Sequence, residues 1–78
     1  MSNLEKYTNV FATTFGITPE QAVTLKYQAI QAWDSVGHMG LIAALEDAFG
    51  IMFEADDIID LSSFEKGREI LKKYSIEV

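Results

Sequence analysis

Near the start of the chain, apolar residues recur every three to four positions, the spacing that places them on one face of an α-helix. Ser2 and Glu5 have the three-residue separation of a capping box, in which each side chain binds the backbone N–H of the other residue. Gly16 follows the last apolar position and readily adopts the left-handed conformation that ends helices. The apolar positions are Leu4, Tyr7, Val10, Phe11 and Phe15. We therefore predict a first helix that ends before Gly16.

Residues 17–33 carry a second helix signal. Thr18 and Pro19 are a typical helix start, because proline suits the first helical position. The apolar positions that follow are Ala22, Leu25, Ala29, Ile30 and Trp33. The pattern alone favours a helix, but the residues leave the conformation of this segment open.

A longer amphipathic pattern begins after residue 34. Asp34 or Ser35 can cap a helix there, and Gly50 can end it. The apolar positions, which fit a period of 3.6 residues, are Val36, Met39, Ile42, Ala43, Leu45 and Phe49. This pattern predicts the central helix of the fold.

The last part of the chain predicts one short helix and one long helix. Residues 54–59 are sufficient for only one or two turns. Ser62 and Glu65 again have the spacing of a capping box, and Lys72 and Lys73 place positive charge where it suits the end of a helix. No strand-like alternation has comparable strength. We therefore predict an all-α fold, a small helical bundle of three main helices plus one short helix.

Length and composition restrict the class of protein. We expect the 78 residues to form a single domain (1–78), of which 49% is hydrophobic and 23% charged, as in ordinary globular proteins. There is no cysteine, so any thiol chemistry must come from another molecule. The net charge of −6 disfavours nucleic acid and favours basic protein partners. Because charged residues interrupt the apolar stretches, we expect no membrane span and, by default, a cytoplasmic location. We expect a monomer, because no broad apolar stripe is left over to pair with a second copy.

Residues 34–41 read Asp-Ser-Val-Gly-His-Met-Gly-Leu and are the most informative part of the chain. They place the Ser35 hydroxyl in the first turn of the central helix, where free backbone N–H groups and the helix dipole favour a phosphate ester. The stretch resembles the attachment motif of acyl and peptidyl carrier proteins, Asp-Ser-(Leu/Val)-Gly-any-(Val/Met)-any-Leu. The resemblance extends over residues 4–74.

This resemblance implies an acyl carrier protein-like fold and function. A phosphopantetheinyl transferase would join 4'-phosphopantetheine from coenzyme A to Ser35, and the thiol of that arm would carry an acyl group as a thioester. The protein would be a shuttle in fatty acid or specialised metabolite biosynthesis, not an enzyme. Its partners would be the transferase, an acyl- or aminoacyl-loading ligase and acyl-processing enzymes with basic docking patches. The family also implies that residues 17–33 form a short helical piece near Pro19 and then a loop.

The same resemblance implies a role in partner recognition for five residues. Asp34 would help to present the serine to the basic transferase, besides serving as a helix cap. Val36 and Met39 would form an apolar patch beside the arm, although each could instead belong to the core. Glu46 and Asp47 would face basic grooves of partner enzymes, with an ordinary solvated helix face as the alternative.

Two glycines depart from the pattern of fatty acid carriers, which usually have acidic residues at these positions. Gly37 and Gly40 each cost about 1 kcal/mol of helix stability relative to alanine. Their presence indicates either a looser helix or the close approach of a partner's backbone. Together with Trp33, His38 and Met39, they make the chain similar to stand-alone carriers of specialised pathways.

Other functions are open on the residues alone. An aminoacyl or peptidyl carrier would have the same fold and modified serine, whereas a plain acidic interaction module would use Asp34 and Ser35 only as a helix cap. A hydrolase would need His38 to activate Ser35, but a residue at that spacing lies along the helix rather than in line with the hydroxyl. We expect His38 to be an exposed helix residue. One histidine with scattered acidic residues predicts no metal site.

Overall fold

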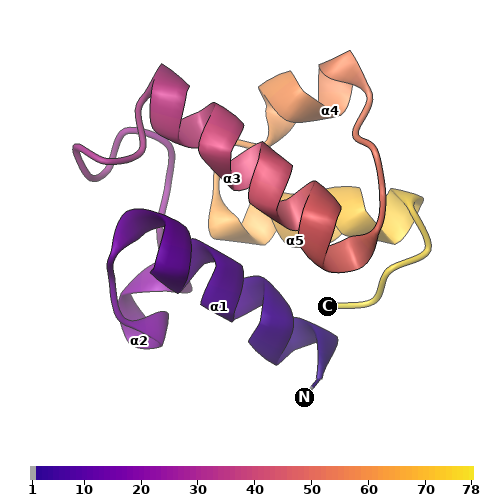
Figure 1. The fold of residues 1–78 in the computed structure, drawn as a ribbon, viewed down its shortest axis with the longest axis horizontal. Coiled ribbons are helices and arrows are strands. Elements are labelled where there is room, and N and C mark those ends of the chain that lie inside the picture. Colours follow the sequence, from indigo (N-terminus) through magenta and orange to yellow (C-terminus); the bar gives the residue numbers. More distant parts are fainter. Residues whose placement is uncertain (1) are drawn as a thin grey trace.

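The computed structural model describes residues 2–78, which form five helices and no strand (Figure 1). The helices are α1 (Asn3–Phe15), α2 (Pro19–Ala22), α3 (Ser35–Phe49), α4 (Ala55–Asp60) and α5 (Phe64–Lys73). In Figure 1, α1 and α3 run in opposite directions and pack together, and α5 lies behind α3. The predicted all-α bundle with three main helices is confirmed, and α2 is the short helical piece expected near Pro19.

The ends of the long helices follow from local capping chemistry. The Ser2 hydroxyl accepts a hydrogen bond from the Glu5 N–H (3.1 Å), and the Glu5 carboxylate accepts one from the Ser2 N–H (3.4 Å). This confirms the capping box predicted for α1. Gly16 and Gly50 end α1 and α3 with φ values of 65° and 64°, a left-handed conformation that glycine adopts without steric penalty.

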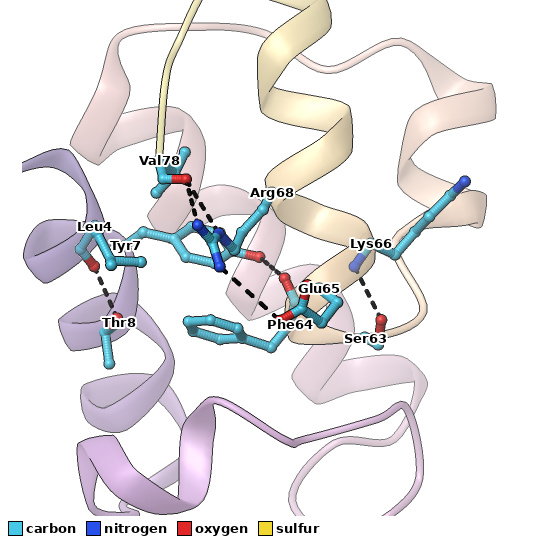
Figure 2. A network of polar contacts seen from close by, with 9 residues as sticks. All are labelled: Leu4, Tyr7, Thr8, Ser63, Phe64, Glu65, Lys66, Arg68 and Val78. Atoms are coloured by element: carbon cyan, nitrogen blue, oxygen red, sulfur yellow. Dashed lines mark hydrogen bonds and ion pairs between the residues drawn. The ribbon is translucent and has the colours of Figure 1, made fainter.

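Helix α5 begins one residue later than the capping box predicted. Ser63, and not Ser62, is the cap, because its hydroxyl accepts a hydrogen bond from the Lys66 N–H at 2.9 Å (Figure 2). Glu65 therefore has no capping role toward Ser62, and its carboxylate lies 3.9 Å from the guanidinium of Arg68. A serine cap is thus present one residue after the predicted position, but the predicted capping box is not formed, because Lys66 has no acceptor to bind the N–H of Ser63.

The register of α5 is set by the loop of residues 23–34, which lies against the connection between α4 and α5. The Tyr27 N–H donates to the Ser62 carbonyl (2.8 Å), and the Phe64 N–H donates to the Leu25 carbonyl (2.9 Å). These bonds hold Ser62 in the connection, so the cap falls on the next residue. The loop implied by the family resemblance is thus confirmed, and the longer helix favoured by the apolar pattern alone is wrong.

Five aromatic side chains from α1, the loop and α5 form the centre of the core. The Phe11 ring lies 5.0–6.2 Å, between centroids, from the rings of Tyr7, Phe15, Trp33 and Phe64. Tyr7 is fully buried, and its hydroxyl donates to the Phe64 carbonyl at 2.7 Å (Figure 2). Burial raises the pKa of Tyr7 far above its ordinary value, so the hydroxyl stays a neutral donor. This bond joins α1 to the start of α5.

A buried carboxylate joins α4 to the end of α5. Asp57 is 3% exposed and accepts hydrogen bonds from the Lys73 ammonium group (2.5 Å) and the Tyr74 hydroxyl (2.6 Å). The Tyr74 oxygen in turn accepts one from the Glu54 N–H (2.9 Å). The hydrogen bonds from Lys73 and Tyr74 lower the pKa of Asp57, and the bond to Asp57 raises the pKa of Lys73. The short helix α4 is therefore anchored by charge as well as by packing.

We expect the Asp57 contacts to make stability depend on acid pH. Because the folded-state pKa lies below the ordinary value of 3.8, their contribution is complete above that value and is lost as the pH falls through the folded-state pKa. Asp57→Asn should lower the free energy of unfolding at neutral pH, and its deficit relative to wild type should shrink below pH 3.8. Urea unfolding at a series of pH values measures this. Asp56→Asn, at the exposed neighbouring position, is the control, and an equal deficit in both variants would contradict the assignment.

Candidate functional site

The candidate site begins with a buried tryptophan followed directly by two exposed residues. Trp33 is fully buried and stacks on Phe15, with ring centroids 5.3 Å apart and 24° between the planes. Its carbonyl accepts a hydrogen bond from the N–H of Gln28, which closes the end of the loop. Because the indole is held in the core, the chain reaches the surface at one defined point, where Asp34 and Ser35 are exposed.

Asp34 is the residue that caps α3, which leaves Ser35 as the first helical residue. The Asp34 carboxylate accepts a hydrogen bond from the Gly37 N–H (2.8 Å), and its carbonyl accepts one from the His38 N–H (2.7 Å). Ser35 is exposed, so an enzyme can approach its hydroxyl from solvent. The positive end of the helix dipole lies beside it, which favours a phosphate ester at this position.

A pocket of about 380 Å³ opens directly beside Ser35. Its wall is mainly apolar and includes Ser35, His38 and Met39 from α3, Ile58 and Ile59 from α4, and Leu61. Tyr27 from the loop completes one side. The sequence did not predict this pocket, because its walls come from three segments that are far apart along the chain.

Val36 and Met39 are surface residues and not core residues. Val36 is 81% exposed and Met39 is 53% exposed. Ile59 on α4 is 77% exposed, and with Met39 it lines the pocket beside Ser35. We call Val36, Met39 and Ile59 the apolar rim. Ile59 was not among the residues predicted from the sequence. The consecutive isoleucines at 58 and 59 were a signal for it, since a short helix packed on one side buries only one of two neighbours.

His38 is half-buried, so the expectation of an exposed residue is wrong. Its Nδ1 accepts a hydrogen bond from the Trp33 indole N–H (3.0 Å), and its Nε2 lies 2.6 Å from the Ile58 carbonyl oxygen. The packing of α4 and the loop around the first turns of α3 encloses this ring. Both nitrogens are engaged away from Ser35, so the arrangement does not provide the base that a serine nucleophile requires.

Two of the three acidic residues expected to meet partners, Glu46 and Asp47, lie away from the pocket. Glu46 is half-buried, and its carboxylate accepts a hydrogen bond from the Phe53 N–H (2.9 Å), which holds the turn after α3. Asp47 is exposed and borders a shallow groove between α1 and α3. It lies about 18 Å along the helix axis from Ser35. The structure therefore brings Asp34, Val36 and Met39 together around Ser35 but not Glu46 or Asp47.

The two glycines near Ser35 have different surroundings. A Cβ atom at Gly37 would overlap the carbonyl oxygen of Ala32, a backbone atom at the end of the loop. The close approach that explains this glycine is thus made by the chain itself and not by a partner. A Cβ atom at Gly40 would meet nothing within 4 Å, and nothing within the chain explains a glycine there.

Residues 2–78 contain no group of three or more His, Cys, Asp or Glu side chains placed to hold a metal ion. None of the helices in this part of the chain has the length and apolar character needed to cross a bilayer.

A scan against models of known protein families and a search of curated proteins found no match. The geometry and residue chemistry around Ser35 are therefore the basis for assigning a function.

Substitution by alanine should have opposite effects on stability at Gly37 and at Gly40. Gly37→Ala should lower the free energy of unfolding by about 1–3 kcal/mol, because the new methyl group meets rigid backbone. Gly40→Ala should raise it by up to about 1 kcal/mol, because alanine favours the helix and the space is open. Urea unfolding of both variants measures the two signs, and changes of the same sign would contradict this account.

Proposed function

We propose that the protein is a carrier protein of the acyl carrier type, in which Ser35 bears 4'-phosphopantetheine donated by coenzyme A. The observation that carries the proposal is the exposed hydroxyl of Ser35 at the first position of α3, within the motif of residues 34–41 and at the edge of an apolar pocket. When bound, this arm supplies the thiol that holds an acyl group as a thioester. The chain has no cysteine to supply one itself.

The residues around Ser35 hold the serine in place. The hydrogen bond from the Gly37 N–H to Asp34 fixes the first turn of α3, and the burial of Trp33 keeps the preceding residue in the core. The helix dipole stabilises the negative charge of a phosphodiester at this position. His38 is engaged with other groups, so activation of the serine belongs to a separate phosphopantetheinyl transferase. The protein acts as a shuttle and not as a catalyst.

The surface around Ser35 fits enzymes that present apolar side chains within a basic patch. The apolar rim supplies three exposed apolar side chains, and the net charge of −6 steers basic proteins toward the chain. The partners proposed are the transferase, a ligase that loads the cargo and acyl-processing enzymes. Asp47 contributes only to a partner that extends along α3, because it lies far from Ser35.

The pocket favours an acyl cargo over an aminoacyl cargo. Its wall is mainly apolar, with Met39, Ile58, Ile59 and Leu61 as contributors. An acyl chain would gain from contact with such a wall, whereas the ammonium group of an aminoacyl thioester would lose its hydration there. The peptidyl carrier function is therefore the second candidate that we propose.

Modification of Ser35 is the direct test of the carrier function. Incubation with a broad-specificity phosphopantetheinyl transferase and coenzyme A should add the mass of one phosphopantetheine group, measured by intact mass spectrometry. Ser35→Ala should gain no mass. Ser62→Ala is the matched control, because Ser62 is also exposed and lines the same pocket, and this variant should be modified like wild type. Unmodified wild type, or modified Ser35→Ala, would favour a plain interaction module.

The apolar rim predicts the effect of an added positive charge on docking. Val36→Lys should lower kcat/KM of the transferase for this protein by about tenfold, because it removes an exposed apolar contact and repels a basic partner. Val23→Lys is the control, since Val23 is also exposed but lies after α2, at a different pocket. The initial rate of modification measures the difference. Equal rates for the two variants would contradict a docking role for Val36.

A further inference from the structure

The hydrogen bonds of His38 define its protonation state. The Trp33 indole nitrogen can only donate, so Nδ1 of His38 accepts this bond and carries no proton. The Ile58 carbonyl oxygen can only accept, so Nε2 carries the proton and donates it. A single arrangement satisfies both partners, namely a neutral imidazole protonated on Nε2.

This ring joins the segments that form the pocket. Trp33 belongs to the end of the loop, His38 to α3 and Ile58 to α4. Helix α4 has only six residues, and its polar links run to α5 through Asp57 and to α3 through the carbonyl of Ile58. The link through His38 lies on the side of α4 that lines the pocket.

We propose that His38 is a pH-sensitive latch that holds α4 against α3 while it is neutral and loosens the pocket wall when it is protonated. A proton on Nδ1 would place two donors, the imidazolium N–H and the indole N–H, against each other at the present distance of 3.0 Å. Both nitrogens belong to one rigid ring. The ring therefore cannot turn away from Trp33 and keep its geometry toward Ile58.

No carboxylate among the described residues is paired with His38, so none is in place to offset a positive charge on the ring. Tyr27 from the loop meets the ring edge to face, with centroids 5.6 Å apart. The carboxylate of Asp34 on the preceding turn is bound to the Gly37 N–H, and that of Asp57 on α4 is bound to Lys73 and Tyr74. The remaining acidic residues of α4, Asp56 and Asp60, are exposed to solvent. Among residues 2–78, the ion pairs seen are Lys73 with Asp57 and Arg68 with Glu65.

The latch regulates the pocket beside Ser35, and only its use for a cargo rests on the proposed carrier function. A neutral ring would hold α4 in place as one wall of the pocket, and a protonated ring would let α4 move away from α3. The latch itself is a property of the unmodified chain. Its test therefore needs neither the transferase nor coenzyme A, and either proposal can fail without the other.

The test is NMR of the unmodified, ¹⁵N-labelled protein between about pH 8 and pH 5, the range in which histidines change charge. At the upper end, the imidazole ¹⁵N shifts should report a proton on Nε2 and none on Nδ1. The Trp33 indole N–H resonance should then shift with the same midpoint as His38. From the upper to the lower end of this range, hydrogen-exchange protection factors of residues 55–61 should fall about tenfold, as expected for the loss of a part-buried hydrogen bond. Asp57 titrates below this range and does not contribute.

Two variants keep the proposal falsifiable. His38→Gln has a side-chain donor and acceptor but does not titrate, and Trp33→Phe retains a buried ring but has no indole donor. Both should lose most of the pH-dependent change in protection. A neutral ring with its proton on Nδ1 would overturn the latch. An undiminished change in either variant, or no change in wild type, would do the same.

Discussion

The candidate site depends on the burial of Trp33. The ring is enclosed by Phe11 and Phe15 and lies nearly parallel to the His38 ring, to which its N–H donates a hydrogen bond, while the next two residues are exposed. Removing a buried aromatic ring typically costs about 3–5 kcal/mol, so the chain cannot shift by one residue here without a large loss of stability. The position of Ser35 at the surface is therefore a consequence of core packing, and the serine sits on a rigid helix start.

Several residues of the motif serve the fold and the candidate site together. Asp34 caps α3 and flanks the serine, and Gly37 lets the Ala32 carbonyl approach the first turn of the helix. His38 binds both the buried indole and α4. Residues 34–41, which resemble an attachment motif, thus also connect the loop, α3 and α4.

The helices were largely predictable, because the signals that start and end them are local. The capping box at Ser2 and the left-handed glycines at 16 and 50 act over three or four residues, and all were observed as predicted. The errors arose where distant segments compete with local preference. Ser63 caps α5 in place of the predicted Ser62, because backbone hydrogen bonds to the loop hold Ser62 in the connection. His38 is half-buried in place of the predicted exposed residue, because α4 packs against it.

The amino-acid sequence was sufficient for the helical class and for the starts of α1 and α3, because these follow from residue spacing and local capping. It made Ser35 a candidate through the resemblance of residues 34–41 to a known motif and through the chemistry of a helix terminus. It could not define the pocket, the exposure of Val36 and Met39, or the partners of His38, since each depends on how separate segments of the chain pack together. Apolar periodicity shows that a helix has a buried face. Only the packing of the neighbouring segments decides which apolar side chains that face includes and which ones remain at the surface.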